Sequence, residues 1–256
     1  SLTSEHPFLN PRLLLERNFA LGIGIATIFG MLFVTPMVML PAMLQQLRDV
    51  PEFAVGALLA IRGLGTALSQ LFLIFWASRW DPRLLFLIGF GTHTWAGLEM
   101  ATFDMNVSLA EVAWATAIQG IGVGFLWVPM TLVTFSNFDP KRSAEGMAMF
   151  HFVRSIASSY YISASFVVVF HTQKMSYSEL AQWINPFSDR WRLDSITGAW
   201  SAEDATGLAG IADEVTRQAT AIGYINSFNL FLWTSLVVYP LIALIVWPTN
   251  GFRKKP

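Results

Sequence analysis

Two arginines, Arg62 and Arg154, interrupt long apolar stretches of this sequence near their middle. A guanidinium at that depth in a membrane-spanning helix is costly in lipid, so it normally faces protein or a water-filled interior. Each lies about ten residues, or ~15 Å of helix, from the nearer end of its stretch, and snorkelling to the interface would be incomplete. Two roles are open for both: tying helix carbonyl groups together, or acting in a substrate pathway or in conformational coupling.

Other polar side chains recur on the same helix faces as these arginines. At helical spacing, Arg62 shares its face with Thr66, Ser69 and Gln70. The fifth apolar stretch carries a similar row, made of His151, Arg154, Ser155, Ser158, Tyr161 and Ser165. A weaker row in the fourth contains Thr116, Gln119, Trp127, Thr131 and Thr134. Because an unsatisfied polar group in hydrocarbon costs several kcal/mol, these rows predict a polar interior shared by several helices.

Two titratable residues of the third stretch also have open roles. Glu99 is the only carboxylate well inside a stretch, and it lies four residues from the predicted outer boundary. It is either hydrated there or a protonatable group of a translocation path. His93 lies nearer the middle of the stretch, either as a hydrogen-bonded packing residue or as a proton relay.

The apolar stretches themselves define the fold class. The chain is 54% hydrophobic and 13% charged, whereas soluble domains carry about 25% charged residues. Each stretch is long enough to cross a ~30 Å hydrocarbon layer as a helix. The sequence therefore predicts an all-α membrane protein with six transmembrane helices. The stretches are Phe19–Leu44, Phe53–Ala77, Leu84–Phe103, Val112–Phe135, Gly146–Phe170 and Tyr224–Val246.

Several function classes find no support in the residues. The net charge is −1, no basic patch or nucleic-acid motif is present, and there is no cysteine. The sequence contains no phosphate-binding loop, no zinc-spaced His/Cys cluster and no Ser/His/Asp signature. We therefore expect no enzyme activity, no cofactor, no metal and no nucleic-acid partner.

Lysines and arginines predict how the chain is oriented. Nine of them lie on the side of both termini and five on the other side, so both termini are predicted to be cytoplasmic. The expected organisation follows the apolar stretches. It comprises a cytoplasmic lead-in (1–18), five transmembrane helices (19–170), an extracytoplasmic loop (171–223), the last transmembrane helix (224–248) and a basic cytoplasmic tail (249–256).

The long outer segment, 171–223, contains its own helical signal. Apolar residues recur there at steps of three and four, at Leu208, Ile211, Ala212, Val215, Ala219 and Ile222. This spacing predicts an amphipathic helix that leads into the last span. The helix either rests on the membrane surface or on the bundle, or offers a docking surface to a partner protein.

Prolines and small residues punctuate the spans. A proline inside a span frees a carbonyl and bends the helix. The spans contain four: Pro36, Pro41, Pro129 and Pro240. Small residues recur every four positions at Gly22, Ala26 and Gly30, and again at Gly120 and Gly124. That spacing predicts close helix–helix approach.

Short motifs along nearly the whole chain carry a family resemblance. In order they are Leu15-Glu16-Arg17-Asn18-Phe19, Leu40-Pro41-Ala42-Met43-Leu44-Gln45, Arg62-Gly63-Leu64-Gly65, Asp81-Pro82-Arg83, Gln119-Gly120-Ile121-Gly122-Val123-Gly124 with Pro129, Phe150-His151-Phe152-Val153-Arg154, and Thr216-Arg217-Gln218 with Tyr224 to Phe228. Together they resemble the ninth to fourteenth helices of 14-helix major facilitator drug:proton antiporters of the EmrB/QacA type. One departure is clear: Tyr160 and Tyr161 stand where that family usually has small residues.

The resemblance implies a fold and a function. It implies one six-helix half of a major facilitator, whose missing N-terminal half is the main partner and carries the proton-coupling acid. Such transporters bind substrate between two halves near the membrane midplane. The implied function is proton-driven export of hydrophobic or amphipathic drugs across a bacterial inner membrane, with a periplasmic membrane-fusion adaptor as a further partner at the 171–223 loop.

In this interpretation Arg62 and Arg154 shape the electrostatics of the substrate cavity or couple its two states. Thr66, Gln70, Ser158 and Tyr161 line it, and Glu99 and His151 belong to the same pathway. Two alternatives stay open: a membrane fragment with no transport activity alone, or a different major facilitator solute transporter. The chain begins with Ser and reads as part of a longer protein. Six helices alone leave one face of the bundle, with its polar rows, without a mate, so we expect no transport by these 256 residues alone.

Overall fold

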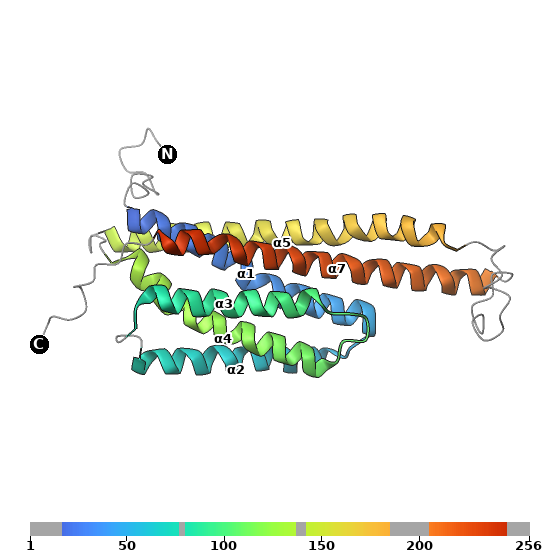
Figure 1. Cartoon of the computed structure of the whole chain (residues 1–256), viewed down its shortest axis with the longest axis horizontal. Helices are drawn as coiled ribbons and strands as arrows, with labels where there is room; N and C mark the ends of the chain where they lie inside the picture. The colour runs from blue at the N-terminus through green and yellow to red at the C-terminus, as the bar shows by residue number, and fades with distance from the viewer. Residues whose placement is uncertain (1–16, 77–79, 137–141, 185–204, 245–256) are drawn as a thin grey trace, which may run out of the picture.

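The computed structural model describes residues 17–76, 80–136, 142–184 and 205–244. These residues form long helices, labelled as in Figure 1: α1 (Arg17–Arg48), α2 (Glu52–Trp76), α3 (Pro82–Ala101), α4 (Leu109–Thr134), α5 (Ser143–Gln182) and α7 (Ala205–Ala243). Within the described ranges there is no strand. Each predicted span corresponds to one of the six helices, which confirms the all-α membrane fold. Five of the six are long and apolar enough to cross a membrane by length and composition, and α3 is the one that does not meet that criterion.

Two helices extend well past the predicted spans. Helix α5 continues to Gln182, beyond the expected end at Phe170, and α7 begins at Ala205 rather than at Tyr224. With 40 and 39 residues, each is about 60 Å long, roughly twice the hydrocarbon thickness. The amphipathic segment around Leu208 is thus the first half of α7. The 185–204 part of the predicted outer loop, the lead-in up to residue 16 and the tail 249–256 lie outside the described residues.

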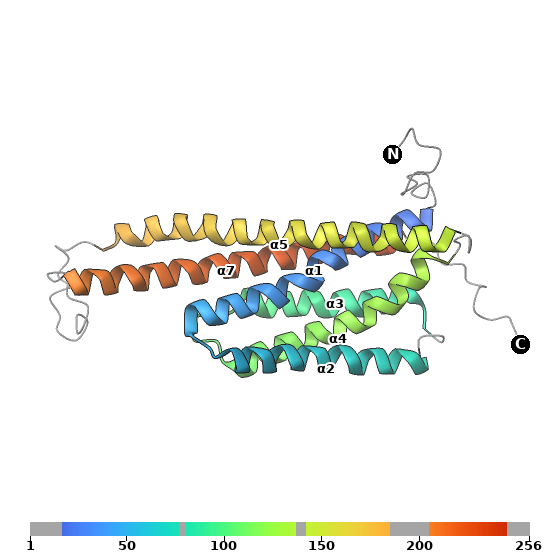
Figure 2. The same cartoon turned by 180° about the vertical axis from the view of Figure 1, so that it is seen from behind.

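The helices pack as an α5/α7 pair and an α2/α4 pair, with α1 and α3 between them. Helix α4 packs on α2 and α3, while α5 packs on α7 and α1. Helix α1 passes obliquely between the α5/α7 pair and the α2/α4 pair (Figures 1 and 2). Beyond the ends of the other helices, α5 and α7 continue side by side as a two-helix arm. We call residues 171–182 and 205–223 the α5/α7 arm.

Local sequence signals set the helix ends. Asp81 caps α3, with its side chain accepting from the Arg83 N–H and Pro82 in the first turn, where its missing N–H is not needed. Ser108 and Glu111 form a reciprocal capping box at the start of α4. Helix α1 ends at Arg48, and the next residue, Asp49, takes a left-handed conformation with φ of 49° and donates its N–H to the Gln45 carbonyl.

Glycines let the helices approach one another, as their spacing predicts. A methyl group at Gly120 would come within 2.1 Å of the Arg62 carbonyl oxygen on α2. At Gly124 it would meet the Ser69 hydroxyl at 1.8 Å, and at Gly22 the Thr134 hydroxyl at 2.2 Å. No side chain fits at these crossings, so the contacts are backbone against backbone or against a hydroxyl.

Burial differs strongly between helices. More than half of the most apolar stretch is buried in α1 and in α4, against less than a third in α2 and in α5. The open face of α2 carries large apolar residues such as Leu64 and Leu68, each about two-thirds exposed. Helices α1 and α4 therefore form the centre of this bundle, and α2 and α5 lie at its sides.

Candidate functional site: two arginines and an aromatic row

Arg62 is buried at the meeting point of three helices. Its side chain is 7% exposed. From α2, its Nε donates to Oε1 of Gln119 on α4, and its Nη2 donates to the Phe33 carbonyl on α1 at 2.8 Å. The guanidinium also lies over the Phe33 ring, 4.9 Å from the centroid. Arg62 therefore ties helices together, as the structural alternative proposed.

The amide of Gln119 continues this network. Its Nε2 donates to the Leu32 carbonyl of α1 over 3.4 Å, and the Gln119 side chain is fully buried. Leu32 lies four residues before Pro36, which has no N–H to offer that carbonyl. Sequence reasoning placed Gln119 on a polar face but not in the site, although the position of Pro36 signalled which carbonyl would need a donor.

Thr66 joins α2 to α4 one turn further along. Its hydroxyl donates to the Gly120 carbonyl at 2.9 Å and contacts the Arg62 carbonyl at 3.1 Å. Gln70 is half-buried on the same face. Thr66 thus takes part in the contact between α2 and α4, and both of its partners are backbone groups.

Arg154 is placed differently. Its side chain is half-buried on α5, with the guanidinium over the Trp127 ring of α4 at 5.2 Å from the centroid. Its Nε is buried and has no hydrogen-bond partner among the described residues. The aromatic face is therefore its main partner, and a cation held only in this way keeps unused donors.

An aromatic row connects the two arginines. The Phe33 ring, which lies beneath Arg62, contacts Phe29 at a centroid distance of 5.7 Å. Phe29 packs edge-on against Trp127 at 5.9 Å, and Trp127 lies beneath Arg154. Phe29 is fully buried, whereas Phe33 and Trp127 are half-buried. We call Phe29, Phe33 and Trp127 the aromatic row.

The two arginines occupy related positions in the bundle. The carbonyl oxygen of Arg62, on α2, lies against Gly120 of α4. The carbonyl oxygen of Arg154, on α5, lies in the same way against Gly30 of α1. Each guanidinium then reaches an aromatic ring on the other central helix. This exchange of partners is what an internal repeat of three plus three helices produces.

The described acids do not neutralise these cations. Among the residues that the structure describes, no aspartate or glutamate forms an ion pair with Arg62 or Arg154; ion pairs occur elsewhere, such as Arg142 with Glu145 at the start of α5 and Arg217 with Glu214 in α7. Backbone carbonyls, an amide and ring faces take that place. Nor do the described His, Asp and Glu residues include a group that could hold a metal ion.

The remaining predicted residues of α5 are spread around the helix. Tyr161 is 6% exposed, and its hydroxyl shares a hydrogen bond of 2.7 Å with Thr234 on α7. It therefore takes part in the α5/α7 contact. His151 is exposed, and Ser158 is half-buried with its hydroxyl on the Ser155 carbonyl at 2.9 Å. Tyr160 points outward, 72% exposed.

Glu99 lies apart from the arginines. It is half-buried at the end of α3, in a polar hollow of about 230 Å³ whose other lining residues are Thr102, Phe103, Asp104, Asn106, Val107 and Glu111. None of these belongs to the aromatic row or to the Arg62 network. The structure thus does not bring Glu99 together with Arg62 or Arg154. His93, in the middle of α3, is fully buried among phenylalanines, and its Nδ1 lies 2.9 Å from the Gly89 carbonyl.

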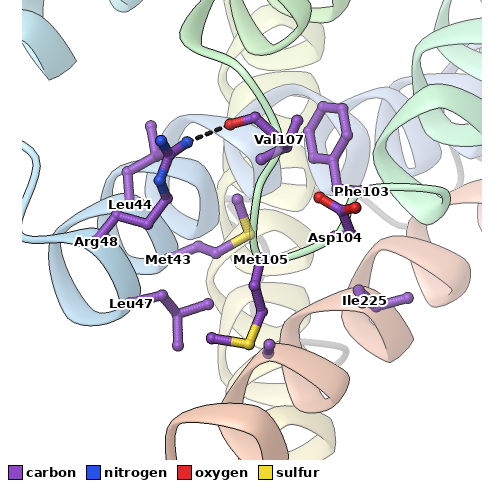
Figure 3. A pocket seen from close by; sticks show the side chains of 10 residues that line it. Met43, Leu44, Leu47, Arg48, Phe103, Asp104, Met105, Val107 and Ile225 are labelled. Carbon is purple, nitrogen blue, oxygen red and sulfur yellow. Dashed lines mark hydrogen bonds between the residues drawn. The ribbon is translucent and has the colours of Figure 1, made fainter. Parts of the chain in front are cut away.

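A second, apolar recess lies near the same end of the bundle (Figure 3). Leu44 and Leu47 line it from α1, Phe103 and Met105 from the α3–α4 connection, and Arg48 closes one side by donating to the Val107 carbonyl. Its free volume is about 10 Å³, which holds one water at most. It is a packing defect at the helix ends, too small for a drug-sized ligand.

The amino-acid sequence is similar to known multidrug export and fatty acid resistance proteins. It is 26% identical to the multidrug export protein EmrB of Escherichia coli (strain K12) over 259 residues, covering 100% of this chain and 49% of that protein. It is 23% identical to EmrB of Haemophilus influenzae, covering 100% and 49%. It is 24% identical to the fatty acid resistance protein FarB of Neisseria gonorrhoeae, covering 96% and 48%.

The chain thus spans about half the length of the curated relatives it matches. A family profile also matches residues 3–161, which include α1 to α4 and the first half of α5. Together with the membrane helices and the exchanged arginine contacts, this match shows that the chain belongs to the Major Facilitator Superfamily, a family of transporters.

Proposed function

We propose that this chain is the C-terminal portion of a proton-driven exporter of hydrophobic or amphipathic compounds. The observation that carries the proposal is the aromatic row, which has a guanidinium over each end. Among the described residues, no carboxylate pairs with either guanidinium. Flat apolar rings beside a cation suit drug-like molecules that combine apolar surface with polar groups. The names of the similar proteins, multidrug export and fatty acid resistance, support the same substrate class.

The other half of the transporter is proposed to dock on the open faces of α2 and α5. Small residues are exposed along α2 at Gly56, Ala60, Gly63 and Ala67, and along α5 at Ser155, Ser159 and Ser163. Small and hydroxyl-bearing residues at such spacing are typical of helix–helix contacts in membranes. Arg154 and Trp127, both half-buried, lie beside this proposed interface. In this proposal they contact substrate, together with His151, Ser158 and Gln70.

Efflux measurements in the full-length protein test the role of Arg154. Arg154→Ala removes the cation over Trp127, an interaction worth about 1–2 kcal/mol, so we expect substrate efflux to fall roughly tenfold. Arg142→Ala is the matched control because Arg142 forms only a half-exposed pair with Glu145 at 3.6 Å. Normal efflux in both Arg62→Ala and Arg154→Ala, at normal expression, would remove these residues from the mechanism.

A periplasmic adaptor is the proposed partner of the α5/α7 arm. The arm continues past the other helices (Figure 2) and carries the exposed polar residues Arg217 and Gln218, both of which donate to the half-buried Glu214. Ile211 is buried between helices, whereas Leu208 is 46% exposed. A photocrosslinker at Leu208 should therefore capture an adaptor in cells that contain the full-length protein. Capture of lipid alone would favour a lone transporter with an arm resting on the membrane.

Orientation and location belong to the same proposal. The surplus of Lys and Arg on the terminal side supports cytoplasmic termini in a bacterial inner membrane. Since the chain has no cysteine, single cysteines at Gln45 and at Ser143, near opposite helix ends, give a clean accessibility test. A membrane-impermeant thiol reagent added to intact cells should label position 45 and leave position 143 unlabelled; the reverse pattern would invert the topology.

The alternative is a fragment that does not transport alone. Exposed small-residue faces on α2 and α5 leave one side of the bundle without a mate. We expect vesicles containing only these 256 residues to show no proton-dependent dye efflux, and to gain it when the matching N-terminal half is co-expressed. Efflux by the chain alone would contradict this view.

A further inference from the structure

We propose that Gln119 and Arg62 form a clamp that replaces the backbone donor missing at Pro36 and thereby fixes the course of α1. Both are positioning residues: they act on α1, the helix that carries Phe29 and Phe33. The inference rests on hydrogen-bond geometry within the described helices. It stands whether or not the chain is part of an exporter.

Pro36 leaves a gap in the hydrogen bonding of α1. It lies inside the helix, is buried, and has no N–H. The carbonyl four residues earlier, that of Leu32, therefore lacks its intrahelical donor. Just before Pro36, the Thr35 hydroxyl donates to the Met31 carbonyl at 2.6 Å, a contact that often accompanies helix bending. The chain on either side of Pro36 is thus less firmly connected than in an ordinary helix.

Two side chains from neighbouring helices donate to this part of α1, and one of them, Gln119, supplies the missing donor. Gln119 on α4 donates to the Leu32 carbonyl over 3.4 Å, and Arg62 on α2 donates to the next carbonyl, that of Phe33, at 2.8 Å. Arg62 also donates to Gln119 itself, so the two donors form one unit. In a membrane interior such substitution of donors is how a proline inside a helix is tolerated.

The clamp rests on a rigid support. Gly120 follows Gln119 and lies against the Arg62 carbonyl so closely that no Cβ fits between them. Thr66 adds a hydroxyl contact to the Gly120 carbonyl at 2.9 Å. Helices α2 and α4 therefore hold the two donors at a fixed separation, and α1 takes its course from them.

The other positions of the same kind lack this arrangement. Pro41, also inside α1, would free the Met37 carbonyl, to which no side chain of the described residues donates. The guanidinium of Arg154, the second arginine in the middle of a span, lies over a ring and donates to no carbonyl of the described residues. Among the described residues, the clamp is thus present at Pro36 and Arg62 and absent at Pro41 and Arg154.

A double-mutant cycle on the 256-residue chain in detergent micelles tests the clamp. Gln119→Leu should lower the thermal unfolding temperature by about 2–4 °C. In a Pro36→Ala background the same change should have a clearly smaller effect, because the introduced alanine offers its own N–H to the Leu32 carbonyl and only the loss of the acceptor for Arg62 remains. Two matched controls accompany the cycle: Gln70→Leu removes another amide, and Pro41→Ala removes another proline. Neither should alter the effect of Gln119→Leu on the unfolding temperature.

Equal effects of Gln119→Leu with and without Pro36→Ala would overturn the proposal. Should Gln119→Leu fail to yield folded protein, recovery of folded protein on adding Pro36→Ala supports the clamp, and failure to recover contradicts it. The two variants thus give a decisive answer even when one of them does not fold.

Spin-label distances separate a change in the course of α1 from a mere loss of stability. The chain has no native cysteine, so labels at Gly24→Cys and Gln45→Cys report on α1 alone. These positions bracket Pro36, about 30 Å apart along a helix; Gly24 faces open space and Gln45 is exposed. Gln119→Leu and Arg62→Leu should each broaden the distance distribution, and Pro36→Ala should restore a narrow one. An unchanged width in both clamp variants would refute the proposal.

Discussion

The carbonyl oxygen of Arg62 lies against the α carbon of Gly120, so that a methyl group at residue 120 would come within 2.1 Å of it. This contact brings the backbones of α2 and α4 together. The same short approach carries Arg62 far enough across α4 to reach α1. Gly120 thus affects both how two helices pack and where a buried cation points.

Gly120→Ala should therefore destabilise the bundle. Backbone on both sides leaves no flexible group to move away, so we expect a loss of about 1–3 kcal/mol and a weakened Arg62–Phe33 contact. Unfolding in mixed micelles with increasing denaturing detergent measures the loss. Gly63→Ala is the control, because a Cβ at Gly63 meets nothing within 4 Å; equal losses in both variants would contradict the packing argument.

Gly30→Ala should disturb the corresponding contact between α1 and α5. A methyl group there would meet the Arg154 carbonyl oxygen at 2.7 Å and its Cγ at 2.8 Å. We expect α5 to move outward and Arg154 to leave the Trp127 ring, with a similar loss of about 1–3 kcal/mol. Disulfide formation between introduced cysteines on α1 and α5 should become slower. Gly24→Ala, which meets open space, should leave that rate unchanged.

The hydroxyl pair of Tyr161 and Thr234 should contribute modestly to the α5/α7 contact. The two oxygens lie 2.7 Å apart. Tyr161→Phe and Thr234→Val should each cost about 0.5–1.5 kcal/mol, and the double variant should cost little more than either one. Reversible unfolding of the four proteins gives the coupling energy. Strictly additive losses would show that the two hydroxyls act independently.

The start of α4 should depend on its capping box. Ser108→Ala removes the acceptor for the Glu111 N–H, a bond of 3.2 Å, and the hydroxyl contact to the Glu111 carboxylate at 3.0 Å. We expect a loss of about 1 kcal/mol and faster amide hydrogen exchange in the first turn of α4. Ser178→Ala on the exposed part of α5 is the control, since Ser178 caps no helix start. Unchanged exchange at residues 109–112 would contradict the cap.

The helices themselves could be predicted from sequence because hydrocarbon thickness imposes a local rule. A run of apolar residues of sufficient length must form a helix to satisfy its own backbone, whatever surrounds it. Glycine spacing likewise indicated where helices approach, and the approach at Gly120 and Gly124 is observed. The ends of α5 and α7 were missed because hydrophobicity marks where lipid ends, and a helix continues past that boundary when its partner helix supports it.

The candidate site was predictable only in part. The face of α2 that carries Arg62 and Ser69 is buried, as its polar pattern indicated, but the α5 row divides: Tyr161 and Ser165 are buried while His151 is exposed. A helical period states which residues share a face. It cannot state how far around the helix its neighbours reach, since that depends on where the other helices lie.

The amino-acid sequence by itself determined that this chain crosses a membrane through helices and holds two cations at mid-depth, because length and hydrophobicity act locally. Only the tertiary structure decided what those cations do. Arg62 donates to a side-chain amide and to a backbone carbonyl near a proline, while Arg154 lies over the face of a tryptophan ring. The difference arises because each partner lies on another helix, and the distances between helices are set by packing across the whole bundle.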